Sequence, residues 1–253
     1  MKTSQFEKGI TSQFCWANIF GIFAIISILT RTVFLVEKHD QIDFSLILIA
    51  KIYLTGLLFD FITLTYLSCI PLLYYILVPS KFFTKKFHNY FILLLYFSLI
   101  YGIIFSAFAE WFFWTEFSTR FNLIAAYYLT NTTELISNIV ETYPVAWISA
   151  SILVISAVIF FSTYKNILEN IRRKTTIKER FQLSLAPFLI CIIVFFTIDS
   201  SKIASKVSGN LYAQELSYNG VYQLFSSYLN HQSDSDGESI TKKTDKIEEN
   251  FPK

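Results

Sequence analysis

The side chain with the clearest chemical potential in this sequence is Asp60, a carboxylate inside an apolar run at 52–78. A charged group at bilayer depth costs at least about 2.5–3.5 kcal/mol, so such residues usually face the interior of a helix bundle. Two interpretations stay open: a group that contacts substrate, or a structural acid that is protonated or hydrogen-bonded to a neighbouring Tyr or Ser. Arg31 lies about a turn from the end of its own apolar run, where snorkelling to the surface explains it.

A second candidate group follows the third apolar run. Glu116 and Arg120 are four residues apart, a spacing that allows an ion pair on one helix face. The alternative is that Arg120, together with Asn122, contacts a lipid phosphate, because the guanidinium group matches phosphate geometry. From these residues alone we favour the solvated ion pair.

The usual motifs of enzyme chemistry are missing from the sequence. The three histidines lie in three different connections, and no cluster of His, Cys and acids has the spacing of a metal site. There is no glycine-rich phosphate loop and no serine elbow. The three cysteines are expected to be reduced thiols that pack as small apolar residues. We expect no metal or cofactor in this chain and no nucleic-acid partner.

Membrane helices must position the candidate groups, because the chain is 53% hydrophobic and 18% aromatic. A soluble domain is nearer ~45–50% apolar. A spanning helix needs ~20 mostly apolar residues, and apolar runs without strand alternation cannot close a barrel. The sequence therefore predicts an all-α, polytopic membrane protein whose domain at 1–198 has five transmembrane helices. They are expected at about 15–36, 52–78, 90–113, 144–164 and 183–198.

Basic residues gather in alternate connections between these runs. The N-terminal tail and the connections at 79–89 and 165–182 are rich in Lys and Arg, whereas the third connection contains more acids than bases. Basic connections stay on the cytoplasmic side of a membrane. We therefore expect a cytoplasmic N-terminus and an extracytoplasmic C-terminus after the fifth helix.

The segments on the expected outer side have helical patterns of their own. Apolar residues recur on one helical face from Phe117 to Tyr128, and a second apolar stripe follows it. We expect short amphipathic helices at about 115–142, lying at the outer interface. Further juxtamembrane helices are expected within 199–231, followed by a polar linker or tail at 232–253.

Three stretches carry longer motifs. They are GLLFD at 56–60, RFNLIAAYYLTNTTELISNIVETYP at 120–144 and GNLYAQELSYNGVY at 209–222. In this order they resemble the membrane region of the lipoteichoic acid synthase-like family, which comprises bacterial phosphoglycerol transferases and sulfatase-like proteins of the alkaline phosphatase superfamily. Two positions depart from the family pattern, since Tyr127 replaces an aspartate and Leu58 stands where a basic residue is common.

The resemblance implies a protein of the bacterial cytoplasmic (inner) membrane, with five membrane helices before a large extracytoplasmic catalytic domain. That domain uses a threonine nucleophile and a divalent metal, often manganese, to take phosphoglycerol from phosphatidylglycerol. Here the chain stops where that domain should begin, so we expect the truncated membrane half of such an enzyme, without catalytic residues. Its expected partners are phosphatidylglycerol-like membrane lipids and a separately encoded catalytic domain.

The expected function is therefore a cell-envelope membrane anchor that positions a lipid headgroup for a phosphoglycerol transferase or sulfatase-like domain. By resemblance, six residues are expected to line the headgroup region through hydrogen bonds and phosphate contact: Asp60, Arg120, Asn122, Tyr128, Glu134 and Asn138. Three alternatives stay open. They are a small transporter or channel, the membrane half of a phosphoethanolamine-transferase-like enzyme, and a purely structural anchor without a lipid site.

Overall fold

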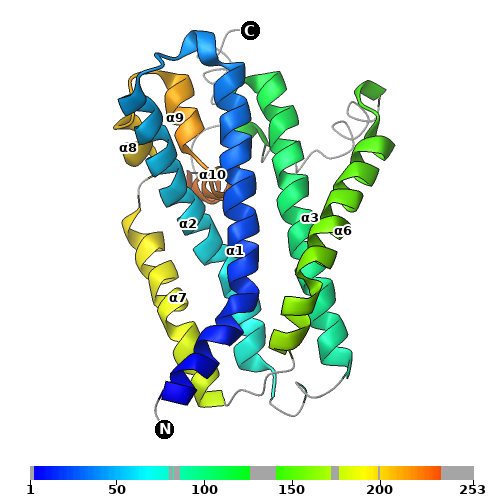
Figure 1. Cartoon of the computed structure of the whole chain (residues 1–253). Helices are drawn as coiled ribbons and strands as arrows, with labels where there is room; N and C mark the ends of the chain where they lie inside the picture. The colour runs from blue at the N-terminus through cyan, green and yellow to red at the C-terminus, as the bar shows by residue number, and fades with distance from the viewer. Residues whose placement is uncertain are drawn as a thin grey trace. The chain divides into compact units, whose positions relative to one another are not determined.

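The computed structural model describes residues 3–79, 82, 86–125, 141–171, 177–198 and 200–234, and all regular structure in these ranges is helical. The elements in chain order (Figure 1) are α1 (Thr3–Glu37), the 3-10 helix η1 (His39–Gln41), α2 (Leu46–Leu77), α3 (Lys86–Phe117), α6 (Val145–Ile171), α7 (Ile177–Thr197), α8 (Ser200–Ser205), α9 (Leu211–Ser217) and α10 (Gly220–Asp234). The predicted all-α class is confirmed for this part of the chain.

Four of the described helices are long and apolar enough to cross a membrane. They are Asn18–Glu37 of α1, Leu46–Tyr74 of α2, Lys86–Phe117 of α3 and Val145–Leu168 of α6. At a rise of about 1.5 Å per residue, ~20 residues span ~30 Å of hydrocarbon. These helices correspond to the first four predicted spans. The fifth predicted span is also helical, within α7, but α7 is not one of the four, so five crossings stay a prediction.

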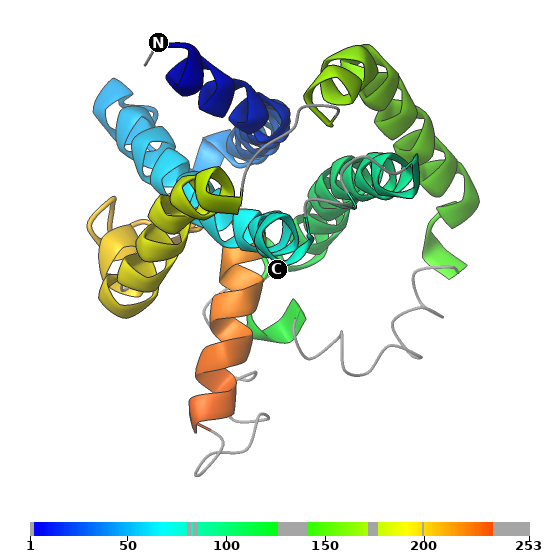
Figure 2. The same ribbon diagram turned by 90° about the horizontal axis from the view of Figure 1, so that it is seen from below.

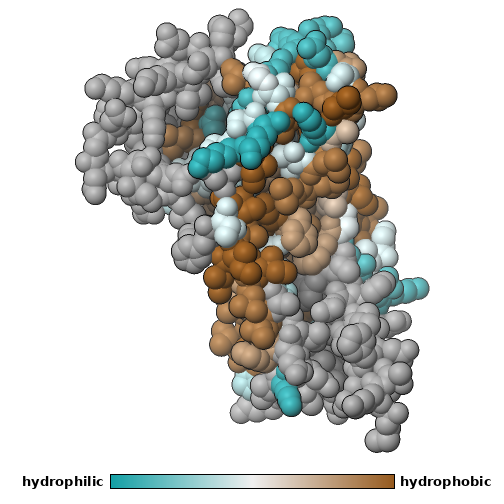
Figure 3. Space-filling view, turned by 90° about the vertical axis from the view of Figure 1, so that its left-hand side faces the viewer, coloured by the Kyte–Doolittle hydropathy of each residue, from teal (hydrophilic) through white to brown (hydrophobic). Residues whose placement is uncertain are grey.

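Large apolar side chains on these helices point away from the protein interior. Leu46 is 86% exposed, Trp147 78% and Phe161 72%. Figure 3 shows hydrophobic side chains over much of the described surface on one face. A soluble monomer rarely exposes so much contiguous apolar surface. The surface is therefore consistent with a membrane protein.

The chain divides into two compact units, and the first consists of Met1–Ile26, Phe61–Phe105 and Ser149–Ile198. In this unit α6 packs beside α3 (Figure 2), where the ring centroid of Phe160 lies 5.6 Å from that of Phe97 and 6.3 Å from that of Tyr96. Helix α7 packs beside the end of α2, where Arg180 Nη1 donates to the Val78 carbonyl oxygen at 2.9 Å.

The second unit consists of Ser27–Asp60, Ser106–Ile148 and Asp199–Lys253. It joins the end of α1, the beginning of α2 and the end of α3 to the short helices near the C-terminus. An apolar cluster holds these elements together: Phe34, Leu35, Ile42, Ile52, Trp114, Val207, Ala213 and Leu216. Within it the rings of Phe34 and Trp114 stack with centroids 4.5 Å apart. Helix α9 is thereby fixed against the ends of the longer helices in this unit (Figure 1).

The first of the predicted interfacial helices differs from the prediction. Phe117, Phe121 and Ile124 are expected on one face of one helix, but α3 continues to Phe117 and residues 118–122 are not helical. The reason is the left-handed conformation of Ser118, whose φ of 53° ends α3. The three side chains still pack in one apolar cluster with Phe113, because the turn brings them together.

Candidate functional site

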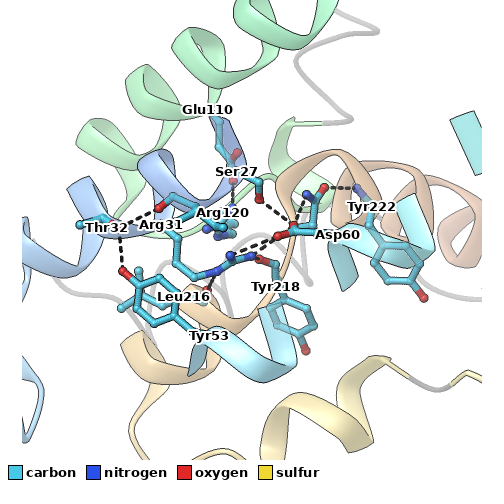
Figure 4. A network of polar contacts seen from close by, with 12 residues as sticks. Ser27, Arg31, Thr32, Tyr53, Asp60, Glu110, Arg120, Leu216, Tyr218 and Tyr222 are labelled. Carbon is cyan, nitrogen blue, oxygen red and sulfur yellow. Dashed lines mark hydrogen bonds and ion pairs between the residues drawn. The ribbon is translucent and has the colours of Figure 1, made fainter. Parts of the chain in front are cut away.

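Asp60 is the centre of a buried polar cluster in the second unit (Figure 4). Its side chain is 2% exposed, and its Oδ1 accepts hydrogen bonds from Ser27 Oγ at 2.6 Å and from Asn219 Nδ2 at 2.7 Å. The guanidinium group of Arg31 completes the set, with Nη1 3.2 Å from Oδ2 and Nη2 3.2 Å from Oδ1. The carboxylate thus meets donors from three side chains, which is how a buried acid is satisfied.

Arg31 does not snorkel, contrary to the sequence-based expectation. Its side chain is fully buried and pairs with Asp60. Its Nε donates to the Leu216 carbonyl oxygen at 2.9 Å, and its Nη2 donates to that of Tyr218 at 3.3 Å. Gly56, one helical turn before Asp60, provides the space, because a Cβ at this position would overlap the guanidinium group. If Arg31 snorkelled to the surface, Asp60 would stay buried without its cation, which would lower the stability of the fold by about 3–5 kcal/mol.

Asn219 connects this ion pair to α10. Its Nδ2 donates to Asp60, while its Oδ1 accepts from the backbone N of Tyr222 at 3.2 Å. The second bond caps the first turn of α10, where backbone N–H groups lack helical partners. The ring centroid of Phe59 lies 5.4 Å from that of Tyr218 and 5.3 Å from that of Tyr222. One asparagine and two aromatic contacts thus fix the beginning of α10 against α2.

A second buried ion pair joins Arg120 to Glu110 of α3. Arg120 Nη1 lies 2.7 Å from Glu110 Oε1, and the side chains are 1% and 8% exposed. The predicted partner, Glu116, is exposed, because the turn at Ser118 separates Arg120 from the helix on which Glu116 lies. Gly220, at the start of α10, fits against the carboxylate of Glu110, where a Cβ would overlap it.

The backbone of Arg120 brings Glu215 into the cluster. The backbone N of Arg120 donates to Glu215 Oε2 at 3.0 Å. Burial raises the pKa of Glu215 to about 7, and the contact with Arg120 counteracts part of this effect. Among the described residues, Nε and Nη2 of Arg120 have no hydrogen-bond partner. These two atoms form an edge with which arginine can bind a carboxylate or phosphate in a bidentate manner.

The cluster is nearly balanced in charge. Two cations, Arg31 and Arg120, face two acids, Asp60 and Glu110, and Arg31 lies close enough to feel the charges of the other pair. Burying a charge costs several kcal/mol unless a partner and further hydrogen bonds offset it. With Glu215 protonated the cluster is neutral, and with Glu215 ionised it carries one negative charge. The docking of α9 and α10 therefore depends on five ionisable groups.

Asp60 and Arg120, two of the six predicted lining residues, lie in this cluster in separate ion pairs. Asn122 instead shapes the turn, since its Oδ1 accepts from the backbone N of Ile124 at 2.9 Å and its Nδ2 donates to Thr119 Oγ1 at 3.0 Å. Three other predicted residues lie outside the described residues: Tyr128, Glu134 and Asn138. The described residues contain no group of three or more His, Cys, Asp or Glu that could hold a metal ion.

Sequence reasoning missed Arg31, Glu110 and Asn219 as members of this site. A signal existed for Arg31, because a second ionisable residue within an apolar run is a natural partner for the first. Glu110 and Asn219 could not be assigned from spacing, since their partners lie 10 and 159 positions away along the chain.

Comparisons of the chain with protein-family models, with curated proteins and with solved structures found no match. The function must therefore be inferred from the residues and their geometry. That geometry offers a buried set of charges that joins three long helices to two short ones, and two donors of a buried arginine without a partner among the described residues.

Proposed function

We propose that the chain is the membrane anchor and lipid-positioning domain of a phosphoglycerol transferase or sulfatase-like cell-envelope enzyme of the lipoteichoic acid synthase-like family. The observation that carries the proposal is the convergence of the three motif stretches in one cluster. The first stretch supplies Gly56 and Asp60, the second supplies Arg120, and the third supplies Glu215 and Asn219. Residues so far apart in sequence meet there because they serve one structural task.

That task is to hold the segment that follows the last predicted span. Two backbone carbonyls of this segment, from Leu216 and Tyr218, accept hydrogen bonds from Arg31, and Asn219 binds Asp60. Helices α9 and α10 therefore have a fixed place at the ends of the longer helices of their unit. In this proposal, α9 and α10 form a fixed surface that a catalytic domain can contact while it acts on a membrane lipid.

The contact with the lipid headgroup is assigned to Arg120. Its Nε and Nη2 have no hydrogen-bond partner among the described residues, and together they are two donors that suit bidentate binding of a phosphate. Asp60 and Glu110 already balance the two positive charges, so a phosphate monoanion would add one negative charge to the cluster, and it is tolerated best while Glu215 is protonated. Because Arg120 is 1% exposed, the headgroup reaches it only when the side chains that cover it move aside.

A titration with short-chain phosphatidylglycerol tests this contact. The purified chain in detergent should bind phosphatidylglycerol more tightly than phosphatidylcholine, and Arg120→Gln should lose that preference. Arg120→Lys keeps the charge but not the paired donors, and should recover only part of it. Lys206→Gln removes an exposed cation and serves as the matched control. An Arg120→Gln protein that is folded and still prefers phosphatidylglycerol as strongly as the parent protein would refute the headgroup contact.

The orientation of the chain is part of the same proposal. We infer a cytoplasmic N-terminus and an extracytoplasmic C-terminus in a bacterial inner membrane, on the basis of the alternating basic connections. A reporter enzyme that is active only outside the cytoplasm, fused after Lys253, should be active in bacterial cells. A fusion at the same place to a reporter that is fluorescent only in the cytosol should be dark. The reverse pattern would place the C-terminus in the cytoplasm. It would then refute both the extracytoplasmic location of α9 and α10 and the proposed lipid substrate.

A small transporter is the second candidate, favoured by buried ionisable residues within candidate spans, among them Arg31, Asp60 and Glu110. Such residues often mark ion or substrate pathways. Here, however, both oxygens of Asp60 are bound by protein donors, a closed arrangement that leaves little for a transported ion. Proteoliposomes that contain the chain should therefore show no proton or cation flux that depends on Asp60, as tested with Asp60→Asn. Such a flux would favour the transporter.

A further inference from the structure

Two of the three cysteines meet in the first unit, whereas the charged cluster belongs to the second. The Sγ atoms of Cys69 in α2 and Cys191 in α7 are 3.0 Å apart, although the residues are 122 positions apart. Both thiols also lie near the Thr65 carbonyl oxygen, at 3.6 Å for Cys69 and 3.2 Å for Cys191. Both cysteines are free thiols. No sequence pattern pairs them, because they belong to different apolar runs.

We propose that Cys69 and Cys191 are a redox site, whose reversible disulfide ties α7 to α2. A disulfide has an S–S distance of about 2.05 Å, so a relative shift of the two sulfur atoms by about 1 Å brings them to bonding distance. Their shared approach to the Thr65 carbonyl oxygen holds both sulfur atoms on the facing sides of the two helices. The pair therefore needs side-chain adjustment, and not a new helix arrangement, to close the bond.

The bond forms by exchange with a small apolar disulfide, the class of oxidant that can reach a site in apolar surroundings. Cys69 is the more accessible sulfur, because it is partly exposed whereas Cys191 is buried. Cys69 attacks the oxidant, forms a mixed disulfide with one half and releases the other half as a thiol. Cys191 then attacks the Cys69 sulfur and releases the second half. Two protein thiols are oxidised and one disulfide reagent is reduced to two thiols, which carry away both protons.

The bridge would add a covalent tie between α2 and α7. Near the beginning of α7, Arg180 Nη1 donates to the Val78 carbonyl oxygen. Cys191 lies further along α7, so the disulfide would fix a second point of the same contact. A cross-link over so long a loop also restricts the unfolded chain, which raises stability. The oxidised protein should therefore unfold at a higher temperature than the reduced one.

Reaction of the full chain with 4,4′-dithiodipyridine, in detergent micelles and on a Cys15→Ser background, tests the site. The expected result is release of two equivalents of pyridinethione per chain, with no pyridyl adduct left in the intact mass. Cys191→Ala should release one equivalent and keep one adduct on Cys69. Peptide mass spectrometry of the oxidised protein should show residues 69 and 191 joined, and a dithiol reductant should separate them. The oxidised sample should also unfold at a higher temperature, a gain that the reductant reverses.

Two results would overturn the proposal. One is a protein that retains both cysteines and carries two stable pyridyl adducts, since each thiol then reacts alone. The other is a protein that releases no thione in the folded state but two equivalents in denaturant, since the thiols are then sealed from oxidants. Cys191→Ser keeps a small polar group at this position and shows whether any change in unfolding temperature comes from the bond or from the side chain.

Discussion

Asn219 Nδ2 lies 2.7 Å from Asp60 Oδ1, although 159 positions separate the two residues. The same asparagine caps α10 through its Oδ1, which accepts from the backbone N of Tyr222. The beginning of α10, which lies outside the candidate spans, is thus held by the carboxylate of Asp60, which lies within one of them. The stability of the cap and that of the buried ion pair between Arg31 and Asp60 are therefore coupled.

Substitution of Asn219 should separate the two roles. Asn219→Ala removes the cap and the donor to Asp60, at a cost of about 2 kcal/mol. Asn219→Asp keeps a good cap but sets a second carboxylate against Asp60, so it should destabilise the chain more than alanine does. Thermal unfolding in detergent measures both. Asn210→Ala removes the cap of α9 together with a donor to the Gln41 carbonyl oxygen, and is the control for the same kind of loss away from Asp60. If Asn219→Asp is as stable as the parent chain, the contact with Asp60 is wrong.

The ion pair itself should show the behaviour of a buried pair. Asp60→Asn leaves the cation of Arg31 buried without its acid, and Arg31→Met leaves the acid without its cation. Each single change should cost about 3–5 kcal/mol. The double variant Arg31→Met/Asp60→Asn removes both charges and should lose much less than the sum of the two. Asp40→Asn, at an exposed position, is the control. Additive losses in the unfolding free energy would mean that the two side chains do not interact.

Local patterns explain what could be predicted from the sequence. The helices and the first four candidate spans follow from apolar runs, because a run of ~20 residues is a property of neighbouring positions. The interior location of Asp60 follows from the cost of exposing a carboxylate to lipid. Both inferences need no knowledge of how distant segments meet.

The partners of the charged residues depend on how distant segments meet, and the predictions for Arg120 and Arg31 were wrong for this reason. Arg120 is four residues from Glu116, yet it pairs with Glu110, because the positive φ of Ser118 ends α3 between them. A single backbone torsion at a serine has no strong sequence signal. The position of Arg31 near the end of an apolar run favours snorkelling until Leu216 is known to offer it a carbonyl oxygen.

Two glycines should be sensitive to the smallest substitution. A Cβ at position 56 would overlap Arg31, and one at position 220 would overlap the Glu110 carboxylate. Gly56→Ala and Gly220→Ala should therefore each cost about 1–3 kcal/mol through displaced side chains. Gly102 is the matched control, because a Cβ there would meet no atom within 4 Å and alanine favours a helix by up to ~1 kcal/mol. Equal unfolding temperatures for Gly56→Ala and Gly102→Ala would contradict the fit of Arg31.

The raised pKa of Glu215 should make stability depend on pH. Burial shifts this pKa from 4.5 to about 7, so the folded chain binds the proton more tightly than the unfolded chain. The stabilising contribution is complete below the unfolded value and is lost as pH rises towards about 7, in total roughly 3 kcal/mol. Unfolding free energies measured between pH 4.5 and about 7 should therefore fall as pH rises.

Glu215→Gln isolates this contribution, because glutamine cannot titrate and still offers an oxygen to the backbone N of Arg120. The variant should lose the decline of stability between pH 4.5 and about 7, and should be more stable than the parent chain at pH 8. Glu116→Gln changes an exposed acid and should keep the original pH dependence. A Glu215→Gln protein with the unaltered decline would place the titrating group elsewhere. It would also mean that Glu215 is already ionised in its contact with Arg120, which would disfavour an arriving phosphate at any pH above the ordinary range of a carboxylate.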